Sequence, residues 1–209
     1  KTLQGDIGSI SVIGAVSPSG GDFSEPVTQN TLRIVKVFWA LDSKLRERRH
    51  FPSINWLTSY SLYSGQLDEW YKKNISEDWG GLRQWAMETL QKESELQEIV
   101  QLVGSDALPE EHRLVLEVAR LIREFFLQQS AYHPVDTYSP LKRQYAYLDA
   151  IRKYGKLAQK AISLDVPLES ILALPGKVEL GKLKFEVRIA SDLPKIVKDI
   201  EKQFSELGV

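Results

Sequence analysis

From about Ser76 to the C-terminus, apolar residues recur every three or four positions, which places them on one face of an α-helix. Local start and stop signals divide this stretch into four helices. These are a helix over residues 78–103 that ends at Gly104, a second that starts at Pro109, a third that starts near Pro140, and a last that follows Asp192. Because each helix carries its own apolar face, the pattern predicts a helical bundle.

The beginning of the chain has a different pattern. Residues 8–16 form a short β-branched run bounded by glycine, which predicts a buried strand. Since a lone strand cannot satisfy its backbone partners, we expect its sheet to lie upstream, in a longer protein. A turn-rich loop follows at residues 17–26, and the spacing then predicts a helix over residues 28–50. Residues 54–63 lack a clean period and predict an irregular crossing between domains.

The predicted fold class is therefore mainly α. Residues 1–62 are expected to be a strand–loop–helix remnant of an α/β domain with a hinge, and residues 63–209 a C-terminal helical domain. Two later pairs, Gly176-Lys177 and Gly181-Lys182, are predicted to be turns.

Composition excludes several classes of protein. The chain has no cysteine, which excludes disulfides and thiolate metal sites, and its three histidines are scattered. The net charge is −1, so no global field favours nucleic acid, and Arg46–Arg49 is better explained as a solvated helix end. No apolar run approaches the length of a membrane span, and we expect a cytosolic chain without direct membrane insertion.

No catalytic motif is present in these residues. A phosphate-binding Gly-x-x-x-x-Gly-Lys-[Ser/Thr] loop is missing, no Gly-x-Gly-x-x-Gly follows a strand, and no Ser/His/Asp arrangement has a recognisable elbow. The residues alone therefore predict neither a catalytic residue nor a metal ligand.

Several long and unusual runs of sequence carry a family resemblance. They lie at residues 14–28, 37–42, 50–57, 59–63 and 132–138. These runs resemble the catalytic A subunit of archaeal and vacuolar rotary ATPases, and the similarity covers most of the chain. One departure is Ser19, where the family often has a second proline. A larger one is that the family's phosphate loop, catalytic glutamate and magnesium-holding aspartate would all lie upstream of Lys1.

The resemblance implies an adenine pocket. Phe51 would stack on the base, Tyr132 and Tyr138 would complete the pocket, and Ala131 and Val135 would lie beside them. Flat rings suit a purine because stacking needs no base-specific hydrogen bond and is worth roughly 1–3 kcal/mol per base. From spacing alone, three aromatic residues near prolines also fit a simple core, and that alternative stays open. In the intact protein the implied ligands are ATP or ADP with Mg²⁺.

Two further segments resemble surfaces through which rotary catalytic subunits contact a central stalk. Residues 104–112 resemble an acidic tip between two long helices, although His112 replaces the usual acid. The implied contacts there are Asp106, Leu108, Glu110 and Glu111. Acidic residues after Pro109 also stabilise a helix start without any partner.

The second segment, residues 20–26, resembles a loop that catches the rotating stalk. Its implied contacts are Asp22, Ser24 and Glu25. The two glycines equally suit a plain turn after a strand.

The resemblance implies the C-terminal part of the catalytic subunit of an ion-translocating rotary ATP synthase/ATPase. It would alternate with non-catalytic B subunits in a hexamer, contact the central stalk and lie peripheral to a membrane sector on the cytoplasmic side. Because the phosphate loop is missing, this chain by itself should be inactive.

Two alternative classes remain for a helical chain of this kind. One is a non-enzymatic helical interaction module whose aromatic residues are all core. The other is a helix-turn-helix DNA-binding protein, which the charge balance disfavours. The histidines do not help to decide, since His50 fits a helix-end cation and His133 an exposed polar residue beside a loop.

Overall fold

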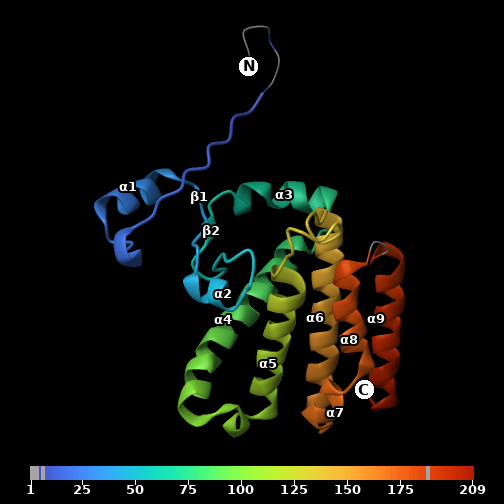
Figure 1. Ribbon diagram of the computed structural model, residues 1–209. Coiled ribbons are helices and arrows are strands. Elements are labelled where there is room, and N and C mark those ends of the chain that lie inside the picture. The colour runs from blue at the N-terminus through green and yellow to red at the C-terminus, as the bar shows by residue number, and fades with distance from the viewer. Residues whose placement is uncertain (1–4, 6–7, 187–188) are drawn as a thin grey trace.

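A bundle of helices makes up most of the structure (Figure 1). The computed structural model describes residue 5, residues 8–186 and residues 189–209. The helices of the bundle are α3 (Ser64–Asn74), α4 (Trp79–Val103), α5 (Glu110–Leu121), α6 (Leu141–Ser163), α7 (Leu168–Leu172), α8 (Pro175–Lys182) and α9 (Ile189–Glu206). Shorter helical turns extend or connect them, namely η2 (Ser105–Ala107), η3 (Ile122–Leu127, a π-helix) and η4 (Leu183–Phe185).

The predicted mainly α fold is confirmed, and local signals set most helix limits. Gly104 ends α4 with a φ of 84°, in the left-handed region where glycine carries no Cβ penalty. Pro109 and Pro140 directly precede α5 and α6, as expected. The last helix starts earlier than predicted, at Ile189, so Pro194 lies inside it. No helix within the described ranges is long and apolar enough to cross a membrane.

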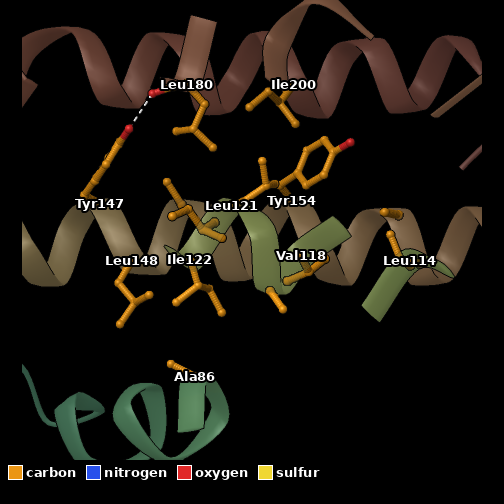
Figure 2. Close-up of a cluster of buried hydrophobic side chains, with 14 of the residues drawn as sticks. Ala86, Leu114, Val118, Leu121, Ile122, Tyr147, Leu148, Tyr154, Leu180 and Ile200 are labelled. Carbon is orange, nitrogen blue, oxygen red and sulfur yellow. Dashed lines mark hydrogen bonds between the residues drawn. The ribbon is translucent and has the colours of Figure 1, made fainter. Parts of the chain in front are cut away.

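Helix α6 forms the centre of the core. Helices α4 and α5 pack on it as a hairpin, and α9 packs on it from the other direction (Figures 1 and 2). Tyr154 and Phe204, both fully buried, meet edge to face with ring centroids 5.7 Å apart. The Tyr147 hydroxyl donates a hydrogen bond of 2.7 Å to the carbonyl oxygen of Leu180, which satisfies a buried polar group (Figure 2).

The prediction of two turns at Gly176 and Gly181 is wrong, because both glycines lie within helix α8. A Cβ added at Gly176 would lie 2.5 Å from Cγ1 of Ile200 in α9, and one at Gly181 would lie 2.6 Å from Cζ of Phe125. These glycines therefore allow close packing of α8 against its neighbours.

Residues 8–16 form no strand within the described part of the chain, and the upstream sheet expected to pair with them stays a prediction. These residues are extended but unpaired, and Ile10 and Val12 are 93% and 90% exposed. Figure 1 shows the segment running away from the bundle. A strand needs a neighbour to take its hydrogen bonds, and no second strand lies beside it in the described part of the chain.

The single helix predicted over residues 28–50 is also wrong. The region holds α1 (Pro26–Ile34), β1 (Val37–Phe38) and α2 (Ser43–Glu47); η1 (Ser19–Gly21) precedes it and β2 (Tyr60–Ser61) follows it. Strands β1 and β2 pair in antiparallel fashion. Because β-branched and aromatic residues favour strands, Val37 and Phe38 pair with β2 instead of continuing a helix.

Asp42 then starts α2, because its Oδ1 accepts hydrogen bonds from the amides of Lys44 (2.8 Å) and Leu45 (3.3 Å). Arg46 and Arg49 are exposed around the end of that helix, as expected. Residues 54–63 are largely irregular, as predicted, apart from β2 and a bridge between Leu41 and Ile54.

Candidate functional site

Exposed aromatic rings gather on the loop between η3 and α6, residues 128–139, which we call the aromatic loop. Tyr132 is 99% exposed and Tyr138 78% exposed, while Phe51 outside the loop is 49% exposed. Large rings held in solvent are the exception in a folded chain. The alternative in which these three residues fill the core is therefore wrong, and their faces are free to contact a partner.

Hydrogen bonds close the aromatic loop at its neck. The Ser130 amide donates to Oδ2 of Asp136 (2.6 Å), and the Gln129 side chain donates to the Asp136 carbonyl (2.5 Å). The Thr137 hydroxyl donates to the Ala131 carbonyl at 3.1 Å. Because these bonds tie both arms of the loop together, the two tyrosines project from a fixed base.

The structure also ties Phe51 to this base. The Gln129 amide donates to the Phe51 carbonyl at 2.7 Å, although the two residues are far apart in sequence. A longer bond of 3.4 Å joins the Gln128 side chain to the Arg49 carbonyl. The segment that carries Phe51 and the loop that carries Tyr132 and Tyr138 therefore meet, as the adenine-pocket hypothesis requires. Ala131 is exposed and Val135 half-buried within the same loop.

Both histidines near this site differ from their sequence interpretation. His133 is half-buried, its ring lies 4.9 Å from that of Phe185, and its Nδ1 accepts the amides of Val135 and Asp136. It shapes the loop rather than lying free beside it.

His50 is 8% exposed and packs on Trp56, with ring centroids 5.4 Å apart. Burial lowers its pKa, and so do the positive charges of Arg123 and Lys184. It is therefore a poor helix-end cation.

A buried ion pair lies below the site, between α4 and η3. Nη2 of Arg123 lies 2.9 Å from Oε1 of Glu93, whose side chain is only 8% exposed. Burial raises the pKa of Glu93, and the Arg123 charge opposes that rise. The pair fixes the end of α5 against α4, directly before the aromatic loop begins.

Between the aromatic loop and the bundle there is a cavity of about 210 Å³. Polar groups line much of it, including Asp136, Arg143 and Lys184. Asp136 and Lys184 are both buried, and no sequence pattern indicates either of them as a site residue.

The acidic tip, residues 104–112, lies at the opposite end of the α4–α5 hairpin (Figure 1). Asp106, Glu110 and Glu111 are all exposed. Leu108 is only 8% exposed, so its side chain belongs to the interior. The Glu110 carboxylate accepts the Leu168 amide at 3.3 Å, which caps the start of α7. Of the four expected contacts, Asp106 and Glu111 are thus the better candidates to face a partner.

The glycine-rich loop before α1 carries the other expected contacts. Asp22 and Ser24 are exposed and Glu25 half-buried. Oδ1 of Asp22 accepts the Ser24 amide at 2.8 Å, and hydrogen bonding from the side chain and backbone of Ser24 lowers the pKa of Asp22. Oε2 of Glu25 accepts the Thr28 hydroxyl at 3.4 Å. These groups lie in one turn, apart from the aromatic loop.

The chemistry of this arrangement is that of a binding surface. It offers flat rings on a fixed loop, with charged groups beneath them, and suits stacking rather than bond-making. Within the described ranges no cluster of histidine or acidic residues could hold a metal ion.

Comparison with known proteins places these features in a family. Residues 68–172 match the family model for the C-terminal domain of V and A type ATP synthase. Residues 1–61 match the nucleotide-binding domain of the ATP synthase alpha/beta family.

Individual relatives agree along the whole chain. The A subunit of the A-type ATP synthase of Methanosarcina acetivorans is 58% identical over 208 residues, which cover 100% of this chain and 36% of that protein. The corresponding protein of Methanoregula boonei is 59% identical over 207 residues, 99% of this chain and 35% of that protein. The chain therefore spans about a third of the length of these curated relatives.

A solved structure has a similar fold. It is that of an ATP synthase component, NeqB, from Nanoarcheaum equitans, with a TM-score of 0.55 at 23% identity over 65% of this chain and 32% of that one. The family match covers half of this chain and lies over the aromatic loop and the acidic tip. The chain belongs to the family of C-terminal domains of V and A type ATP synthases.

Proposed function

We propose that this chain supplies the adenine side of an ATP site and a stalk-contacting lever to the catalytic subunit of an ion-translocating rotary ATP synthase/ATPase. The observation that carries the proposal is the aromatic loop, which holds Tyr132 and Tyr138 in solvent while its base bonds to the carbonyl of Phe51. The names of the two relatives, both of them A subunits of A-type ATP synthases, support the same assignment.

In this proposal residues 1–62 are the last part of the nucleotide-binding α/β domain with its hinge, and residues 63–209 are the helical domain. The phosphate loop and the groups that hold Mg²⁺ would belong to the rest of the protein, because this sequence has no such loop. Non-catalytic B subunits and the central stalk are the proposed partners, in a complex peripheral to a membrane on its cytoplasmic side. Closing on nucleotide would swing the bundle about residues 51–63.

The adenine side of the site is tested with Tyr132→Ala and Tyr138→Ala in the complete, assembled ATPase. We expect each to raise the KM for ATP by about tenfold to a hundredfold, since losing one stacked ring removes roughly 1–3 kcal/mol of binding. Tyr132→Phe and Tyr138→Phe are the matched controls, because they keep the ring and should leave KM nearly unchanged. Unchanged KM in both alanine variants would favour an interaction module with no nucleotide role.

The lever is tested at the opposite end of the hairpin. Asp106→Ala combined with Glu111→Ala should change the number of ions moved per ATP but leave the KM for ATP within about twofold, because distant sites act additively. Glu110→Ala serves as a comparison, since it removes the cap of α7 and is expected to cost about 1 kcal/mol of stability. A large rise in KM with unchanged coupling would show that the tip has been assigned wrongly.

A further inference from the structure

A lysine ammonium group is buried beside the cavity under the aromatic loop. Lys184 lies in η4, between α8 and α9, and only 7% of the residue is exposed. A buried charge is costly unless hydrogen bonds and an opposite charge compensate it. Its partners therefore indicate which part of the fold depends on it.

The polar partners of this ammonium group lie in η3, directly before the aromatic loop, and in the loop itself. Nζ of Lys184 donates to the carbonyl of Glu124 at 3.0 Å and to the carbonyl of Gln128, and it lies 3.9 Å from Oδ2 of Asp136. The two carbonyls lie at the end of η3, where helical carbonyls lack partners within the helix. Lys184 thus caps the helix at the point where the loop leaves it, from 56 to 60 positions away in sequence.

Asp136 connects Lys184 to the two loop segments that hold Tyr132 and Tyr138. The oxygen that faces Lys184 also accepts the Ser130 amide, two residues before Tyr132. Asp136 itself lies two residues before Tyr138. One carboxylate, held by one lysine, therefore joins the two arms of the loop at the points where the aromatic residues begin.

Neighbouring residues hold η4 in place below the loop. Nη2 of Arg143, in α6, donates to the Lys184 carbonyl at 2.7 Å. The ring of Phe185 packs on His133 at 4.9 Å, in the middle of the loop. Two consecutive residues of η4 thus contact the loop from beneath, one through charge and one through a ring.

We propose that Lys184 is a positioning residue for ATP binding, which holds the aromatic loop in the conformation that presents Tyr132 and Tyr138 to adenine; this rests on the function proposed above. Without the lysine, the loop samples more conformations, and ordering it on binding lowers affinity. Lys184 does not contact the nucleotide. Its loss therefore weakens nucleotide binding without changing the chemical step.

The test uses the complete, assembled ATPase. Lys184→Met, which keeps most of the length of the side chain but removes its charge, is expected to raise the KM for ATP about tenfold with kcat within about twofold. Lys184→Arg retains the charge and donors and should recover most of the affinity. Lys182→Met is the matched control, because Lys182 is exposed and pairs only with Glu179 among the described residues, so KM should stay unchanged.

A second measurement reports on the loop itself. Amide hydrogen exchange at Ser130 and Thr137 should be at least about tenfold faster in Lys184→Met, while the amides of α4 stay protected. If protection is lost throughout α4 and α6 as well, the variant has a general structural defect and Asp136→Asn decides. That variant removes the partner charge, and unchanged KM and loop exchange in it would overturn the proposal.

The tyrosine variants separate this proposal from the proposed function. If Tyr132→Ala raises KM while Lys184→Met changes neither KM nor loop exchange, the positioning role is wrong and the adenine site stands. If neither tyrosine variant raises KM, the adenine site is wrong, and the positioning role falls with it.

Discussion

Replacing Phe204 by alanine is expected to lower the free energy of unfolding by about 3–5 kcal/mol. The side chain is fully buried between α9 and α6, where its ring meets that of Tyr154. Removing it leaves a cavity in addition to the lost transfer energy, because the packed neighbours relax only in part. Denaturant unfolding of the whole chain, followed by circular dichroism, measures the loss.

Leu102→Ala is the control for this substitution, since Leu102 on α4 is 85% exposed and should change stability by less than about 0.5 kcal/mol. The result also tests the extent of the core. Phe204 lies beyond residues 68–172, so a loss below about 1 kcal/mol would mean that α9 contributes little to the bundle.

Replacing Arg123 by methionine is expected to cost about 3–5 kcal/mol at about pH 7, because it leaves the Glu93 carboxylate buried without its partner. The loss should depend on pH. Burial already raises the pKa of Glu93, and removing the opposing Arg123 charge raises it further. Between the ordinary glutamate pKa and this raised pKa, the folded state binds more protons than the unfolded state, so stability falls as pH rises through that window.

The variant should therefore differ least from the parent chain below a pH of about 4.5, the ordinary value, and most near neutral pH. Unfolding at a series of pH values checks this. Arg83→Met on the exposed face of α4 is the matched control and should show neither the loss nor its pH dependence. Combining Glu93→Met with Arg123→Met should restore most of the stability, and a double variant as weak as Arg123→Met would contradict the account.

Local patterns are sufficient to predict the long helices. Their apolar period and their limits at Gly104, Pro109 and Pro140 are properties of a few adjacent residues. The strand at residues 8–16 cannot be decided in this way, because a strand depends on a neighbouring chain segment. The wrong prediction at the glycines of α8 has a related cause. Glycine favours a turn locally, and only packing against Ile200 and Phe125 explains why it is used inside a helix.

The residues of the candidate site also differ in how far they can be predicted from the sequence. The resemblance predicts Phe51, Tyr132 and Tyr138 as site residues, and the structure shows that all three are exposed. The groups that hold them, above all Asp136 and Lys184, carry no sequence signal, because their partners lie in distant segments. Leu108 is the opposite case, since an apolar residue in an exposed turn gives no local sign that its side chain is buried.

The ion pair between Glu93 and Arg123 has a mechanical consequence. A slide of α5 along α4 by one turn, about 5.4 Å, would separate the Arg123 guanidinium from the buried Glu93 carboxylate and leave that carboxylate without this partner. The two helices of the hairpin therefore resist sliding along each other, and the hairpin behaves as a rigid unit. Helix α5, from Glu110 to Leu121, is about 18 Å long at 1.5 Å per residue. Tilting it by about 10° about one end would move the other by about 3 Å, so a small rotation at the base becomes a displacement of atomic scale at the tip.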